Sequence, residues 1–159
     1  MIAPRAASDE WNVEAAFDYR MRTAIFQANF ANLDKIRGFV SRAAGDAGMD
    51  EREVYAVQLA TDEACTNIIV HAYGEKNNGQ IEITCNIQEQ GLTIILHDHG
   101  RSFEPAKVRE PNLNERLEKR DIGGLGWYLI CTLMDEVKFE SSPEAGNVLT
   151  LVKRKGGST

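Results

Sequence analysis

Two neighbouring segments of regular hydrophobicity restrict the fold more than any other feature of this sequence. Apolar residues occupy every second position from Ile81 to Ile87, and the more apolar run LTIIL at residues 92–96 follows a break at Gly91. Alternation in one segment, then a short turn and a second apolar segment, is typical of a β-hairpin. The sequence therefore predicts an antiparallel pair of strands near the middle of the chain.

The flanking segments predict further strands and three helices. The segment RTAIFQANF alternates like a strand, and the spacing of Leu33, Ile36, Phe39 and Val40 predicts a helix with Asn32 as its N-cap. Later in the chain we expect a helix over about 51–73 closed by Gly74, a glycine turn and an apolar helix within 123–137, and strands at 137–141 and 147–154.

The order of these elements predicts the fold class α+β. Helices come in two groups and strands connect as hairpins, which favours a two-layer sandwich: a mostly antiparallel sheet with helices on one face. No repeat or internal linker interrupts residues 22–154, so we expect one domain there. Residues 1–21 are expected to be an N-terminal extension of uncertain order, and residues 155–159 a loose tail.

Residues 101–122 differ in character from the rest of the chain, because they are charged, contain two prolines and include few apolar residues. Such a segment is too long for an ordinary connection. Three interpretations stay open: a functional loop, a lid over a site, or a locally disordered segment.

Four polar residues stand on the predicted helix 51–73, whose apolar residues indicate burial. On a helical wheel, Glu63, Asn67 and His71 recur every four residues and form one row at the edge of the apolar face. A carboxylate and an amide in this row point into a cleft beside the core. The alternative is a solvated row with a structural histidine, and Asp62, farther around the helix, is expected to be solvated.

Three further motifs follow in order, and each is a weak signal alone. Asp98 ends a buried type of strand and Gly100 follows, so the acid can accept a hydrogen bond from a ligand amino group, unless the pair is simply a turn. The run GGLG at 123–126 opens a helix whose amides and dipole favour a phosphate, although a hinge has the same composition. Thr150 lies on a late strand after a glycine turn.

In this order the motifs resemble those of the GHKL ATPase superfamily, whose Bergerat fold is a two-layer α+β sandwich. The segments DEACTNIIVHAY, DHGRSFEP and GGLGWYLICTLMDEV are similar to those of the bacterial anti-sigma factor serine/threonine kinases, and the resemblance covers about residues 22–154. It identifies the N box, two glycine boxes and a last contact at Glu63-x-x-x-Asn67, Asp98-x-Gly100, Gly124-x-Gly126 and Thr150.

The resemblance implies a site for ATP and Mg²⁺. Asn67 would hold Mg²⁺ through its amide oxygen, which is a hard ligand for a hard ion. Asp98 would accept a hydrogen bond from the adenine amino group, and Gly100 would leave room for the ring. Glu63 would be the catalytic base that orients the attacking hydroxyl or water. His71, one turn after Asn67, is counted with the nucleotide-binding residues.

The resemblance also implies how the rest of the nucleotide would be held. Gly124, Leu125 and Gly126 would lay backbone amides against the phosphates, and Thr150 would reach the adenine edge through water. Residues 101–122 would form the ATP lid. Three cations of this loop could reach the γ-phosphate: Arg116, Lys119 and Arg120. The alternative is that the loop is simply solvated.

Ser102 departs from the superfamily pattern, because many members carry a second glycine there, as DxGxG. The departure points to the anti-sigma branch and away from the histidine kinases. A histidine-bearing dimerisation domain is not expected within 159 residues either, so a two-component sensor kinase is not favoured.

The function that the resemblance implies is an anti-sigma factor with kinase activity. Such a protein binds a sigma factor and phosphorylates a serine or threonine of a small anti-anti-sigma (STAS-type) antagonist; a homodimer is expected as well. The alternative is a module of the same fold that binds nucleotide and a partner without significant kinase activity. The change Glu63→Gln separates the two, because only a kinase would lose transfer while keeping ATP.

Charge and cysteine content limit the partners and the compartment. The formal net charge is -6 and the pI is near 5.1, which argues against a dedicated nucleic-acid binder. The three cysteines lie far apart with no CxxC pair, so we expect reduced core residues. Because a signal peptide and an apolar run of about 20 residues are both missing, we expect a cytoplasmic protein without membrane contact.

Overall fold

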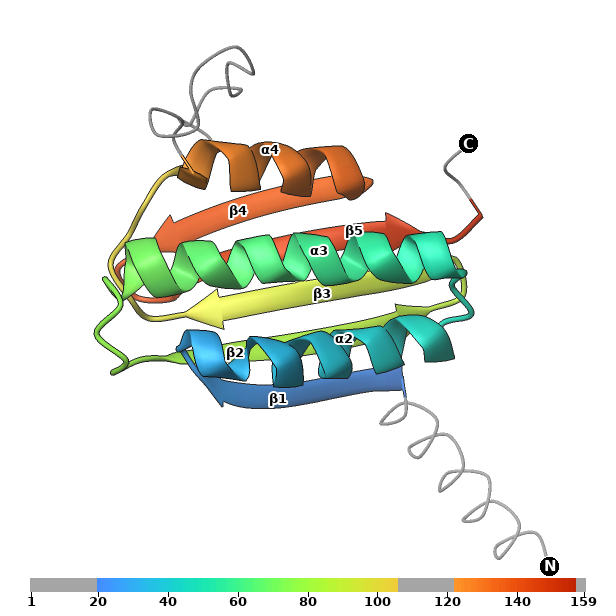
Figure 1. The fold of residues 1–159 in the computed structure, drawn as a ribbon, viewed down its shortest axis with the longest axis horizontal. Helices are drawn as coiled ribbons and strands as arrows, with labels where there is room; N and C mark the ends of the chain where they lie inside the picture. The colour runs from blue at the N-terminus through green and yellow to red at the C-terminus, as the bar shows by residue number, and fades with distance from the viewer. Residues whose placement is uncertain (1–19, 106–121, 157–159) are drawn as a thin grey trace, which may run out of the picture.

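The computed structural model describes residues 20–105 and 122–156, which form a sheet of five strands covered on one face by helices (Figure 1). The strands are β1 (Met21–Gln27), β2 (Gln80–Gln88), β3 (Gly91–Asp98), β4 (Glu136–Ser142) and β5 (Gly146–Arg154). Their order is β1-β2-β3-β5-β4, and every neighbouring pair is antiparallel. The predicted hairpin and the predicted α+β sandwich are both confirmed.

The helical layer crosses the sheet on one side only (Figure 1). It consists of α2 (Leu33–Asp46), α3 (Glu51–Asn67) and α4 (Ile122–Leu133), with short helical turns η1 (Phe30–Asn32) and η2 (Ile68–Ala72). α3 lies in the middle of this layer and contacts both α2 and α4. The two-layer arrangement therefore places the end of α3 directly over the ends of the central strands.

Alternating burial along β3 explains why the sheet has one covered and one open face. Leu92, Ile94 and Leu96 are at most 1% exposed and face the helices, whereas Ile95 between them is partly exposed on the other face. Successive side chains of a strand point to opposite faces. The apolar side chains of β2 and β5 follow the same rule, so a single core lies between sheet and helices.

Side chains fix the starts of α3 and η1, whereas α2 begins at the expected N-cap position without a side-chain bond. At α3 a capping box joins Asp50 and Glu53, since each side chain accepts a hydrogen bond of 2.9 Å from the other's backbone N–H. At α2 the expected cap Asn32 has helical backbone angles and makes no capping bond. The chain enters that helix through η1, and Asn29 caps η1 by accepting from the Asn32 N–H at 3.1 Å.

The helix predicted over 51–73 changes its form after Asn67. Residues Ile68–Ala72 form a π-helical turn, with the Tyr73 N–H donating to the Ile68 carbonyl at 3.1 Å. Gly74 follows with φ of 62°, as expected for a glycine that ends a helix. π-turns are rare and often occur at functional sites. This turn therefore indicates a functional site at the end of α3.

The expected glycine turn before α4 is not present, because α4 begins at Ile122 and its glycines lie inside the helix. At position 126 of α4, a Cβ would lie 2.7 Å from Oε2 of Glu63 on α3, so a larger residue there would displace that carboxylate. Cys131 on α4 is exposed, contrary to expectation, whereas Cys65 and Cys85 are buried as expected.

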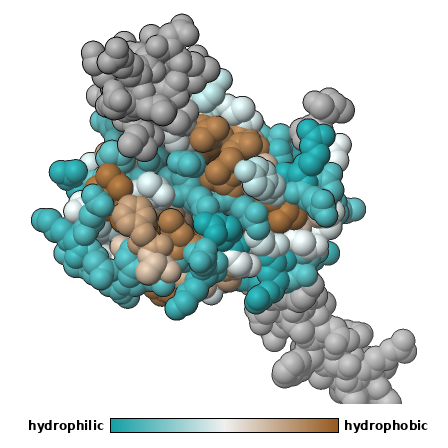
Figure 2. All heavy atoms as spheres, viewed as in Figure 1, coloured by the Kyte–Doolittle hydropathy of each residue, from teal (hydrophilic) through white to brown (hydrophobic). Residues whose placement is uncertain are grey.

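Hydrophilic residues cover most of the helix-bearing surface, and a patch of hydrophobic residues lies beside α4 (Figure 2). The 12 residues of α4, IGGLGWYLICTL, include no charged side chain. Within residues 20–105 and 122–156, no helix combines the length and the apolar character that crossing a membrane requires.

Candidate functional site

Three buried polar side chains meet where β3 ends, β5 begins and α3 ends, and they line a small cavity. The polar residues are Asn67, Asp98 and Asn147. The aromatic residues of the wall are Phe103, Trp127 and Phe139. The cavity measures about 10 Å³, which is the space of about one water molecule. A larger ligand therefore enters only after aromatic side chains move.

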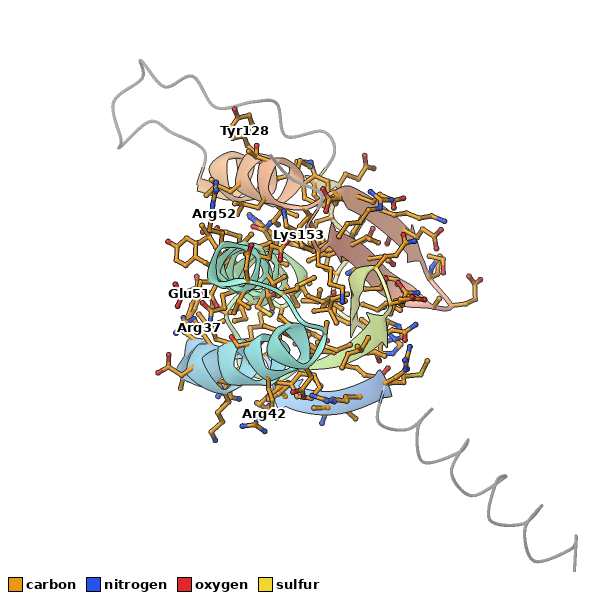
Figure 3. All side chains as sticks on the ribbon, turned by 90° about the vertical axis from the view of Figure 1, so that its right-hand side faces the viewer. Arg37, Arg42, Glu51, Arg52, Tyr128 and Lys153 are labelled. Carbon is orange, nitrogen blue, oxygen red and sulfur yellow. The ribbon has the colours of Figure 1, made fainter. Side chains whose placement is uncertain are left out.

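A larger hollow of about 540 Å³ lies at the opposite end of the sheet, between the start of α3 and the end of α4. Arg52 and Lys153 are among its lining residues (Figure 3). The ammonium of Lys153 donates to the carbonyl of Leu133 at 2.9 Å. No residue singled out in the sequence lines this hollow, so we take the smaller cavity as the candidate site.

Asp98 is a buried acceptor with one oxygen to spare. Its side chain is 1% exposed, and Oδ1 accepts hydrogen bonds of 2.9 Å from the Gly100 N–H and from Nδ2 of Asn147. Oδ2 has no hydrogen bond within the described residues. Burial raises the pKa of Asp98, and the bonds from Asn147 and Gly100 oppose that rise. The free oxygen suits a ligand donor such as an amino group.

Asn147 is the site residue that the sequence analysis missed, and Thr150 does not take its expected place. Asn147 pairs with Asp98 across β5 and β3, so both side chains point toward the helices. Thr150 pairs with Ile95 and Lys138 on the open face of the sheet. Because side chains alternate along a strand, a residue three positions after Asn147 must face the other way. The register of the strand after Gly146 was the signal that identifies Asn147.

Asn67 fits the role of a metal ligand. Its side chain is 7% exposed, lines the cavity and makes no hydrogen bond to any described residue. The amide oxygen beside the cavity is therefore available to a ligand, an ion or water. Within residues 20–105 and 122–156, no cluster of His, Cys, Asp and Glu forms a metal cage. Mg²⁺ suits a site of this kind, since it commonly takes few protein ligands and completes its shell with phosphates and waters.

Glu63 lies one helical turn before Asn67, with its carboxylate against α4 at Gly126. The side chain is partly buried. Burial raises its pKa, and the charge of the neighbouring Asp62 adds to the rise. A carboxylate with a raised pKa beside the cavity-lining helix turn can accept a proton, which is what a catalytic base must do.

Asp62 is paired rather than solvated as expected. Oδ2 accepts from Nε of Arg37 at 3.0 Å and lies 2.9 Å from its Nη2, while Oδ1 is buried without a hydrogen bond. Arg37 lies where α2 meets α3 (Figure 3). The pair raises the pKa of Arg37. Asp62 therefore joins α2 to α3, and its charge acts on Glu63 from the outer side of the helix.

His71 does not line the cavity. The π-turn widens the helix after Asn67 and takes His71 out of the row that it was expected to share with Glu63 and Asn67. Its ring packs against Phe103 with centroids 5.8 Å apart, and its carbonyl accepts from the Arg101 guanidinium. His71 thus supports the loop that closes the cavity.

Gly100 has a packing role in this structure, and its expected place beside the adenine ring stays a prediction. A Cβ at this position would lie 2.6 Å from the Ala72 carbonyl oxygen. The Arg101 N–H donates to that same carbonyl at 2.7 Å. Glycine is therefore required so that the loop after β3 can lie against η2, which holds the Asp98 backbone next to Asn67.

The remaining predicted contacts lie partly outside the described residues. Gly124 and Leu125 belong to the first turn of α4, at the positive end of the helix dipole. The lid cations Arg116, Lys119 and Arg120 lie outside the residues that the structure describes.

The two-layer α+β sandwich, with a buried acid at the end of β3 and a buried amide at the end of α3, defines a GHKL-type ATPase domain. The model of the histidine kinase-like ATPase domain family matches residues 26–153, and the chain belongs to this family. Membership of an ATPase-domain family implies that the chain binds ATP.

Several relatives share this domain over most of their length. The serine-protein kinase RsbW of Bacillus subtilis is 32% identical over 126 residues, which are 77% of this chain and 78% of the relative. The protein of the same name from Halalkalibacterium halodurans is 34% identical over 122 residues, covering 74% and 73%. The anti-sigma F factor of Clostridium novyi is 33% identical over 102 residues, covering 64% and 71%.

Proposed function

We propose that this chain is an anti-sigma factor with ATP-dependent serine/threonine protein kinase activity. It binds a sigma factor and phosphorylates an anti-anti-sigma protein of the STAS type. The names of relatives at 32% to 34% identity support this function. The observation that carries it is the amide of Asn67, which lines the same cavity as Asp98 and makes no hydrogen bond to a described residue.

The residues of the site suit the parts of phosphoryl transfer. Asp98 binds the adenine amino group through Oδ2, and the first amides of α4, at Gly124 and Leu125, bind phosphate oxygens. Asn67 holds Mg²⁺, which neutralises phosphate charge when bound. Glu63 takes the proton of the attacking hydroxyl as its oxygen bonds to the γ-phosphorus and the bond from that phosphorus to the leaving ADP oxygen breaks.

We also propose that the protein forms a homodimer and acts in the cytoplasm. A homodimer is supported by Met21 and Ile25 of β1, which are 40% and 60% exposed. Ile25 belongs to the open face of the sheet, and a second copy covering this face would bury it. Ile25→Lys should then lower the mass measured by analytical ultracentrifugation to that of a monomer. The proposed location is the cytoplasm, because ATP and a sigma factor are both present there.

The test measures ATP binding and transfer separately. Calorimetric titration with ATP should show saturable binding that Mg²⁺ strengthens in the wild type but not in Asn67→Ala. Transfer of labelled phosphate to a purified anti-anti-sigma protein should be lost in Glu63→Gln, while ATP binding persists. Absence of binding at millimolar ATP would exclude the kinase.

The alternative is a nucleotide-binding interaction module without significant kinase activity. Both descriptions require ATP to enter a cavity of about 10 Å³, so only a transfer assay separates them. If Glu63→Gln and the wild type bind ATP and the sigma factor equally, and neither transfers phosphate, the module is the correct description.

A further inference from the structure

Four side chains form a continuous series of hydrogen bonds that ends on Asp98. The hydroxyls of Ser102 and Ser141 lie 2.8 Å apart. Ser141 Oγ donates to Oδ1 of Asn147 at 2.7 Å, and Asn147 Nδ2 donates to Oδ1 of Asp98 at 2.9 Å. The series joins the loop after β3 to β4, then to β5, and returns to the end of β3.

The direction of these bonds follows from the chemistry of Asn147. An amide oxygen only accepts, so Ser141 must donate its single hydroxyl hydrogen to Asn147. Ser102 must then donate to Ser141, although the two hydroxyls alone would allow either direction. Every hydrogen therefore points toward the Asp98 carboxylate, and bonds aligned in this way strengthen one another.

The orientation of the Asn147 amide is also determined. Nδ2 donates to Asp98 and, at 3.1 Å, to the carbonyl of Arg101. The flipped amide would place its oxygen against two acceptors and leave the Ser141 hydroxyl facing a donor. Since Asn147 is 1% exposed, water cannot replace these partners easily. Ser141 thus donates to the amide oxygen of Asn147. The Asp98 carboxylate cannot do so, because it has no hydrogen to donate.

The same residues hold the beginning of the loop that follows Gly100, residues 101–105, which we name the lid stem. Its first two residues are bound from opposite sides. Arg101 is tied to Ala72 by its N–H and to Asn147 by its carbonyl, and Ser102 is tied to Ser141. A movement of the lid stem therefore changes the partners of Asn147, and through Asn147 the position of Asp98.

We propose that Ser141 and Ser102 are positioning residues that couple the lid stem to recognition of the nucleobase by Asp98. Ser141 holds Asn147 so that Oδ2 of Asp98 stays directed at the amino group of the base, and Ser102 extends this connection to the lid stem. The ligand class is a purine nucleotide with an exocyclic amino donor, and the inference rests on the proposed nucleotide site. Ser102 occupies the position of the second glycine of DxGxG, and a glycine there would have no donor.

The test compares hydroxyl removal with hydroxyl replacement. Calorimetry with Mg-ATP should give a Kd about 5-fold higher for Ser141→Ala, because the oxygen of Asn147 loses its donor. Ser141→Thr keeps the hydroxyl and should restore Kd to within about 2-fold. Ser102→Ala should have a smaller effect, about 2-fold, since its bond is exposed to water. Ser142→Ala, a serine change in the same hairpin outside the series, is the matched control.

A second readout distinguishes positioning from simple stability. Hydrogen exchange of the lid-stem amides should slow when ATP binds the wild type, and this slowing should be lost in Ser141→Ala. In a kinase assay KM for ATP should rise while kcat stays unchanged, because a base contact is equal in ground and transition states. Thermal unfolding of each variant identifies any general damage to the hairpin.

The possible results separate the inference from the site on which it rests. If Asp98→Asn abolishes ATP binding while Ser141→Ala binds like the wild type, the site is correct and the positioning role is wrong. Equal weakening by Ser141→Ala and Ser142→Ala, or no rescue by Ser141→Thr, also overturns the positioning role. If Asp98→Asn binds ATP as well as the wild type does, the proposed nucleotide site is wrong.

Discussion

Asn147 of β5 donates a hydrogen bond of 2.9 Å to the Asp98 carboxylate at the end of β3, and each side chain is 1% exposed. The two residues are 49 positions apart in the sequence. Burial raises the pKa of Asp98, and this hydrogen bond is the largest of the interactions that oppose the rise. The hydrogen bond from Asn147 therefore favours the charged form of this buried carboxylate.

Replacing Asn147 by Leu, a side chain of similar size, should raise the pKa of Asp98 further. Protonation turns one carboxylate oxygen into a donor and weakens the other as an acceptor, so ATP affinity should fall as the pH falls through this raised pKa. The loss should begin at a higher pH in Asn147→Leu than in the wild type, with affinity about 10-fold lower at neutral pH. His97 and His99 are the other titratable groups that act on Asp98.

The measurement is calorimetric ATP binding between pH 5 and 8, taken as the difference between variant and wild type so that the titration of ATP itself cancels. Thr150→Val, on the open face of the same strand, is the control and should leave the profile unchanged. Identical profiles for Asn147→Leu and the wild type would exclude a role for the amide.

Gly126→Ala should reduce phosphate transfer more than ATP binding. The new methyl group would lie 2.7 Å from Oε2 of Glu63 and would move that carboxylate from its place against α4. Since a displaced base lowers kcat, we expect a loss of about 10- to 100-fold. Single-turnover transfer from labelled ATP measures the loss, and calorimetry should show ATP affinity within about 3-fold of the wild type. A normal transfer rate would mean that Glu63 is not the base.

Gly38→Ala should stabilise the protein. Gly38 is an exposed residue within α2, and a Cβ there has no neighbour within 4 Å. Alanine favours a helix over glycine by about 1 kcal/mol, so the free energy of unfolding should rise by about that amount. Chemical denaturation measures this change, and the variant also controls for helix propensity in Gly126→Ala. A decrease in stability would show that Gly38 has a contact role.

Arg37→Met should destabilise the domain by about 1 kcal/mol, because it leaves the half-buried Asp62 carboxylate without its partner. Lys35→Met, an exposed change on the same helix, should have little effect. The difference between the two variants in urea denaturation should shrink at 1 M salt, where ion pairs are screened. A difference that is independent of salt would indicate that Arg37 acts through packing alone.

Strand pairing and the layer arrangement could be predicted from sequence, because alternation along 81–87 and along β5 is set by burial on one face. Asp98 was found for the same reason: it ends an apolar strand and a glycine follows. Asn67 and Glu63 share one turn of a regular helix, so their spacing fixed their relative direction. In each of these cases the local period of the backbone determined where the side chain points.

Other features depended on contacts between distant segments. Asn147 could not be chosen over Thr150 without the register that pairs β5 with β3. His71 left the expected row because α3 widens into a π-turn, which no residue pattern indicated. Gly100 is a glycine because the backbone of Ala72 approaches it closely, and the identity of such a neighbour is a property of the folded chain.

The insertion of β5 between β3 and β4 has a consequence for synthesis. During translation Asp98 is synthesised 49 residues before Asn147, its hydrogen-bond partner on the neighbouring strand. Domains generally fold as units during synthesis, and this cavity cannot form until β5 is available to pair with β3. A nascent or truncated chain therefore contains every predicted N-box residue and still has no pocket, so nucleotide recognition marks completion of the fold.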